Sequence, residues 1–169
     1  YYEEKSPQTR QRFIKNLRQA CDWAEEAQVV LAIEIMDDPF INSIEKYLAV
    51  EKEIDSPYLF VYPDIGNVSA WHNDVYSEFY LGHHAIAALH LKDTYAVTES
   101  SKGQFRDVTF GQGCVKWEEA FDILKQTNYN GPFLIEMWSE NCETVEETRA
   151  AIQEAQAFLY PLIKKAGLM

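Results

Sequence analysis

Short, continuous apolar runs alternate along the chain with longer segments in which apolar residues recur every three or four positions. The runs cover residues 29–33, 58–62, 85–89 and 133–135, and their length is typical of strands that are buried on both faces. The longer segments have the spacing of amphipathic helices, and we expect five of them, beginning near residues 7, 43, 74, 117 and 144. This alternation predicts an α/β fold built from βα units around a parallel sheet.

Residues at the predicted helix ends support these boundaries. Ser6 suits the cap of the first helix because Pro7 follows it, and Thr144 with Glu147 has the pattern of a capping box before the last helix. Pro161 should kink or end that last helix, because proline has no N–H to donate. No linker-like stretch divides the sequence, so residues 1–169 are predicted to form a single domain.

A carboxylate or an imidazole follows every apolar run. Glu34, Asp64, His90 and Glu136 stand at or just past the carboxyl ends of the four predicted strands. Because sites in parallel α/β folds are built at this edge of the sheet, we expect the four side chains to converge. Such a set suits one divalent ion, which would be Mn²⁺, Mg²⁺, Co²⁺ or catalytic Zn²⁺. The alternative is that each is an ordinary polar residue where a buried strand meets a loop.

Charge and composition exclude several classes of protein. The chain has 15 basic and 27 acidic residues, and its net charge of −12 argues against nucleic-acid and anionic-membrane partners. Its 47% hydrophobic content argues against disorder, and no apolar run approaches the roughly 18 residues of a membrane span. Cys21, Cys114 and Cys142 lack CxxC spacing, which favours a reducing, cytoplasmic location.

Five ordered motifs surround the candidate ligands. They are IEIMD at 33–37, YPDIGN at 62–67, HLKDT at 90–94, FRDV at 105–108 with FGQG at 110–113, and LIEMW at 134–138. Together they resemble the L-ribulose/L-xylulose 5-phosphate 3-epimerases, which belong to the xylose-isomerase-like TIM barrels. The resemblance covers the second half of that (β/α)₈ barrel, strands five to eight with their helices. Since a complete barrel has about 250 residues, and since the first of these 169 residues is Tyr1 rather than methionine, we expect a piece of a longer protein.

The resemblance also implies a reaction. Glu34, Asp64, His90 and Glu136 would ligate one divalent metal, and Glu34 and Glu136 would also be the catalytic acid/base pair. Removing the C3 proton of a pentulose phosphate and returning it on the opposite face requires one such group on each side of the substrate. The implied setting is cytoplasmic sugar-phosphate metabolism, with L-ascorbate degradation as one example.

Four further residues are candidates for substrate contact. Lys92 lies two residues after His90, so an extended strand would point both side chains to the same side. Arg106 lies in a long polar loop, Asn67 follows Asp64 by three residues, and Trp138 follows Glu136 by two. The competing interpretations are a solvated loop charge for Arg106, a turn-forming role for Asn67 and simple packing for Trp138.

Two alternatives to the 3-epimerase remain open. A 1,2 aldose–ketose or hydroxypyruvate-type isomerase would use the same site. In a different class, the chain would be a catalytically incompetent fragment that binds metal and self-associates, because four parallel strands leave two open edges. We expect a homo-oligomer for the same reason.

Overall fold

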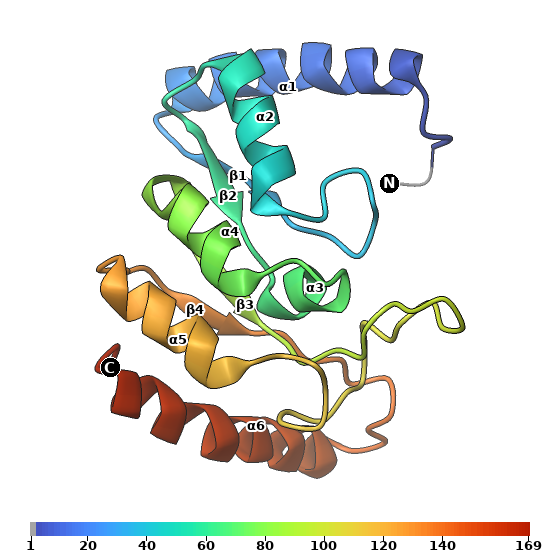
Figure 1. Cartoon of the computed structure of the whole chain (residues 1–169), viewed down its shortest axis with the longest axis vertical. Coiled ribbons are helices and arrows are strands. Elements are labelled where there is room, and N and C mark those ends of the chain that lie inside the picture. The colour runs from blue at the N-terminus through green and yellow to red at the C-terminus, as the bar shows by residue number, and fades with distance from the viewer. Residues whose placement is uncertain (1–2) are drawn as a thin grey trace.

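The computed structural model describes residues 3–169, and its helices and strands follow the predicted alternation. Figure 1 shows the helices passing from one end of the molecule to the other in chain order. The strands are β1 (Leu31–Glu34), β2 (Leu59–Tyr62), β3 (Leu89–Leu91) and β4 (Phe133–Ile135). The helices are α1 (Pro7–Ala27), α2 (Ile44–Ile54), α3 (Ile65–Ala70), α4 (Val75–Gly82), α5 (Trp117–Gln126) and α6 (Val145–Ala166), with a 3₁₀ turn, η1, at His83–Ala85.

The strands run parallel in two hydrogen-bonded pairs. β1 pairs with β2 from Leu31↔Leu59 to Glu34↔Tyr62, and β3 pairs with β4 around His90↔Leu134. Two isolated parallel bridges, Val61↔Ile86 and Asp64↔His90, join the pairs. The strand order is therefore that of the chain, which is the arrangement of successive strands in part of a (β/α)₈ barrel.

Local capping fixes the starts of the long helices as predicted. The hydroxyl of Ser6 accepts a hydrogen bond from the Thr9 N–H at the start of α1. Thr144 and Glu147 form both hydrogen bonds of the capping box at the start of α6. Of the two outcomes predicted for Pro161, the helix end does not occur, because α6 continues to Ala166, and the kink stays a prediction. The long helix α6 therefore tolerates a proline, which has no backbone N–H to donate.

The third strand and one helix differ from the sequence prediction. Residues 85–89 were predicted as a strand ending before His90, but the 3₁₀ turn extends through Ala85 and β3 begins only at Leu89. His90 is thus the middle residue of β3, with the buried residues Leu89 and Leu91 on either side. The short helix α3 was not predicted, and Asp64 is its N-cap through a hydrogen bond from the Asn67 N–H.

The core lies between the strands and the helices. Its fully buried members include Tyr47, Phe79, Leu89, Phe121 and Leu159. On the sheet face away from this core, Ala32 is exposed and Leu134 keeps 45% of its surface exposed. In a complete barrel such residues fill the interior, so this face is uncovered in the described chain. Within residues 3–169 we find no helix long and apolar enough to cross a bilayer.

Candidate metal centre

The four predicted ligands converge at the carboxyl ends of the strands. Glu34 ends β1, Asp64 follows β2, His90 lies in β3 and Glu136 directly follows β4. One potential ligand atom from each lies within 4.8 Å of the others. Asp64 is fully buried, whereas the side chains of Glu34, His90 and Glu136 are 36%, 18% and 17% exposed. The cluster is therefore anchored on one side and accessible on the other.

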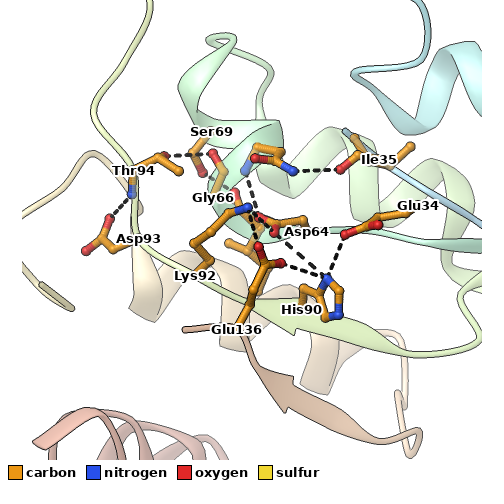
Figure 2. Close-up of polar contacts among 12 residues, drawn as sticks. Glu34, Ile35, Asp64, Gly66, Ser69, His90, Lys92, Asp93, Thr94 and Glu136 are labelled. Atoms are coloured by element: carbon orange, nitrogen blue, oxygen red, sulfur yellow. Dashed lines mark hydrogen bonds and ion pairs between the residues drawn. The ribbon is translucent and has the colours of Figure 1, made fainter. Parts of the chain in front are cut away.

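His90 lies between the two glutamates. Its Nδ1 is 2.9 Å from Glu34 Oε1 and 3.0 Å from Glu136 Oε2. Figure 2 shows Glu34 and Glu136 approaching this imidazole from different sides. They come from β1 and β4, the two ends of the strand order. The two carboxylates consequently face each other across the centre.

A buried lysine completes the charge cluster. Lys92 is 7% exposed, and its Nζ lies 2.9 Å from both Asp64 Oδ2 and Glu136 Oε1. The sequence prediction that Lys92 and His90 point to the same side is confirmed, since both contact Glu136. The ammonium is thus held by two of the proposed ligands, and its predicted contact with substrate stays a prediction.

The electrostatics follow from this pairing. Burial works to lower the pKa of His90, but the nearby carboxylates of Glu136 and Glu34 outweigh burial and raise that pKa to about 9. Burial raises the pKa of Asp64 against the opposing effect of Lys92. For Glu136 the adjacent His90 and Lys92 overcome burial and lower the pKa. Two internal cations thus offset part of the negative charge of the three carboxylates.

The donor set fits a hard divalent ion. Asp64 Oδ2 and Glu136 Oε2 are buried and accept no hydrogen bond of good geometry, although both lie near a cation. Because Nδ1 of His90 carries at most one hydrogen, it can donate to only one of the two glutamates. Buried oxygens that lack hydrogen-bond partners are costly unless another group binds them. A metal ion bound by Glu34, Asp64, His90 and Glu136 would supply that partner.

A cleft of about 600 Å³ opens over the centre. Its lining includes Glu34, His90 and Glu136 together with Asn67. Asn67 is 2% exposed and donates from Nδ2 to the Ile35 carbonyl, while its buried Oδ1 has no partner. An acceptor therefore remains available beside the centre.

Arg106 and Trp138 lie together in the lining of this cleft. The guanidinium carbon of Arg106 is 3.8 Å from the ring centroid of Trp138, a cation–π contact, and Nη1 is 3.9 Å from Glu140 Oε1. Trp138 retains 36% exposure. The long polar loop thus places Arg106 in the lining of the cleft.

A family model describes nearly the whole chain. The model for xylose isomerase-like TIM barrels matches residues 1–162. The chain belongs to this family. The sequence-based resemblance and the partial-barrel fold are thereby confirmed.

Curated relatives of the chain are named as epimerases. L-ribulose-5-phosphate 3-epimerase UlaE of Escherichia coli O157:H7 is 44% identical over all 169 residues, which cover 56% of its length. A second relative, named as the putative L-ribulose-5-phosphate 3-epimerase SgbU of Haemophilus influenzae, is 49% identical, with 58% of its length covered. The chain thus spans less than two thirds of the length of these relatives.

Solved structures support the fold at low sequence identity. A structure of L-ribulose 3-epimerase aligns with 98% of the present chain, and the alignment covers 58% of the epimerase chain, with a TM-score of 0.77 and 17% identity. D-allulose 3-epimerase from Methylomonas sp. matches 98% of the chain and 58% of its own, with a TM-score of 0.74 and 16% identity. At such identities the likeness establishes the fold alone.

Two residues near the candidate metal centre were not predicted to belong to the site. Tyr62 lies against His90 with ring centroids 4.2 Å apart and the ring planes tilted by 49°, and burial raises the pKa of its phenol to about 12. The strand register pairs Tyr62 with Glu34, and a register between strands cannot be read from the sequence. Asp93 is 1% exposed and binds the loop that follows Arg106.

Proposed function

We propose that the chain carries the metal-binding and acid–base part of an enzyme that epimerises C3 of L-ribulose 5-phosphate and L-xylulose 5-phosphate. The observation that carries this proposal is the convergence of Glu34 and Glu136, from opposite ends of the strand order, on the cluster completed by Asp64 and His90. The names of the curated relatives favour this substrate class. The setting would be cytoplasmic, consistent with three free cysteines, in a pathway such as L-ascorbate degradation.

In this proposal Glu34 and Glu136 exchange the C3 proton. One carboxylate removes the proton from one face of the substrate, and the other, as a carboxylic acid, returns a proton to the opposite face. Their placement on either side of His90 supports these complementary roles. A bound Mn²⁺, Mg²⁺, Zn²⁺ or Co²⁺ would act as a Lewis acid that stabilises the negative charge developed when the proton leaves.

The cleft residues would orient the sugar phosphate. The unpartnered Oδ1 of Asn67 is suited to accept a hydrogen bond from a substrate hydroxyl. Trp138 offers an apolar wall, and Arg106, which is held over that wall, offers a positive charge to the anionic substrate. Lys92 lines the same cleft, so we keep it among the candidate contacts.

Proton exchange in D₂O tests the reaction. Incubation of pentulose phosphate with the metal-loaded protein should introduce deuterium at C3, as detected by NMR. Glu34→Gln and Glu136→Gln should each slow this exchange at least about a hundredfold, which is the usual contribution of a general acid or base. Exchange at C1 would instead support the 1,2 aldose–ketose or hydroxypyruvate-type isomerase, and exchange at neither position would refute both.

The uncovered sheet face favours a second candidate. Leu134 is 45% exposed on the face that a complete barrel would fill, so the chain alone would bind metal, self-associate and turn over nothing. Light scattering tests this candidate and the homo-oligomer together. A stable monomer that exchanges the C3 proton would contradict it, whereas an oligomer with bound metal and no exchange would support it.

A further inference from the structure

Lys92 is an internal counter-charge of the metal centre. Its ammonium lies 2.9 Å from Asp64 and 2.9 Å from Glu136 and is almost fully buried (Figure 2). Arg106, whose side chain also lines the cleft, lies instead over Trp138. The positive charge of Lys92 is therefore fixed beside the ion site and is poorly screened by solvent.

The formal charges of the site suggest what this arrangement achieves. The carboxylates of Glu34, Asp64 and Glu136 contribute three negative charges, and Lys92 returns one. A divalent ion bound with a neutral His90 returns the other two, so the loaded centre is neutral. A trivalent ion would leave the same centre with one excess positive charge. Unbalanced charge at a partly buried centre is disfavoured because that charge loses part of its solvation.

We propose that Lys92 determines the charge of the ion that the centre accepts and selects divalent over trivalent metals. The inference rests on the proposed metal centre, but not on the sugar or the reaction. Lys92 repels a trivalent ion by one more unit of charge than it repels a divalent ion. The ratio of the Tb³⁺ affinity to the Mn²⁺ affinity isolates this effect. Both ions bind to the same metal-free protein, so any change that a substitution makes in the metal-free state affects both affinities equally and cancels in the ratio.

Two probe ions measure that ratio. Mn²⁺ binding can be followed by electron paramagnetic resonance and Tb³⁺ binding by luminescence, both on the purified chain without substrate. In Lys92→Met and Lys92→Gln the preference for Tb³⁺ over Mn²⁺ should rise at least tenfold above that of the wild type. Lys92→Arg, which keeps the charge, should stay within about threefold of the wild type. Lys125→Met is the matched control, since it removes one exposed lysine charge from α5 and should not change the ratio.

Several outcomes overturn the inference, and they can be told apart. An unchanged ratio in both neutral variants shows that the charge of Lys92 does not select the ion. Loss of both ions in these variants, with normal binding by Lys92→Arg, shows that the lysine holds the ligands in place instead. If the wild type binds neither ion, the proposed metal centre itself fails, and this inference fails with it. Circular dichroism of each variant shows whether it is folded. If Lys92→Met does not fold, Lys92→Gln, whose side chain can still form hydrogen bonds, provides the neutral variant for the test.

Discussion

Replacing Asp93 by asparagine tests how the loop behind Arg106 is held in place. Asp93 is 1% exposed and follows Lys92 at the end of β3. Five donors surround its carboxylate, namely the backbone N–H groups of Thr94, Gly111, Gly113 and Val115 and the indole N–H of Trp117. One buried side chain thereby ties the end of β3 to the segment that leads into α5.

The magnitude follows from how these donors are shared. Oδ1 accepts two of the hydrogen bonds, from Thr94 and Val115, and Oδ2 accepts the other three. The single side-chain oxygen of asparagine can best accept the three hydrogen bonds that Oδ2 accepts in the wild type. Its NH₂ group then faces the N–H groups of Thr94 and Val115, which lose their acceptor. Two unsatisfied buried donors cost about 1–3 kcal/mol each, so Asp93→Asn should lower the free energy of unfolding by about 4 kcal/mol. Loss of the carboxylate charge weakens the three hydrogen bonds that remain.

Urea unfolding followed by circular dichroism measures this loss. Asp122→Asn makes the same chemical change on the exposed side of α5 and should alter the free energy of unfolding by less than about 0.5 kcal/mol. Trypsin should also cleave after Arg106 faster in Asp93→Asn, because the loop loses its anchor. A free energy of unfolding within about 1 kcal/mol of the wild type would refute the assignment of Asp93 as that anchor.

Three further predictions concern other sites. Glu78 is buried and accepts N–H bonds at the start of α2; because burial raises its pKa, its ionisation opposes folding. The stability of the wild type relative to Glu78→Gln should therefore fall as the pH rises from 4 to 7, as measured by urea midpoints. Gly66→Ala would place a Cβ 2.6 Å from the Lys92 carbonyl oxygen, so thermal unfolding should show a loss of about 1–3 kcal/mol, and an unchanged melting temperature would contradict this packing. Since the pKa of His90 is raised to about 9 and a ligand must be neutral, Mn²⁺ binding at pH 7 should release about one proton. Calorimetry in two buffers of different ionisation enthalpy detects this release as a difference in the observed heats, and equal observed heats would argue against it.

Capping residues and apolar runs predicted the presence of most helices and strands better than the residues at which they begin and end. The cap at Ser6 and the capping box at Thr144 depend on residues close in sequence, and both helices begin where expected. The run at 85–89 misled the prediction because apolar character alone does not separate a 3₁₀ turn from a strand. Helix α3 escaped prediction because it has six residues, too few to show a periodic pattern.

The convergence of the candidate ligands could be predicted from the sequence, but their ion pairs with Lys92 could not. Glu34, Asp64, His90 and Glu136 were recognised because each follows an apolar run, and this rule needs only the strand order. The contact between Lys92 and Glu136 joins residues 44 positions apart, and its existence depends on the side-chain directions of two strands. The sequence therefore indicated a positive charge near the centre without indicating what that charge contacts.

The register of the parallel strands explains why a partial barrel can form this centre. Glu34 is paired with Tyr62, and Asp64 is bridged to His90. The Glu136 N–H donates to the carbonyl of Leu91, which extends the pairing of β3 and β4 by one residue. Backbone hydrogen bonds within this chain thus bring the four candidate ligands to one edge of the strands. The proposed metal site is therefore a property of these four strands, whereas enclosure of a substrate requires whatever covers the uncovered sheet face around Leu134.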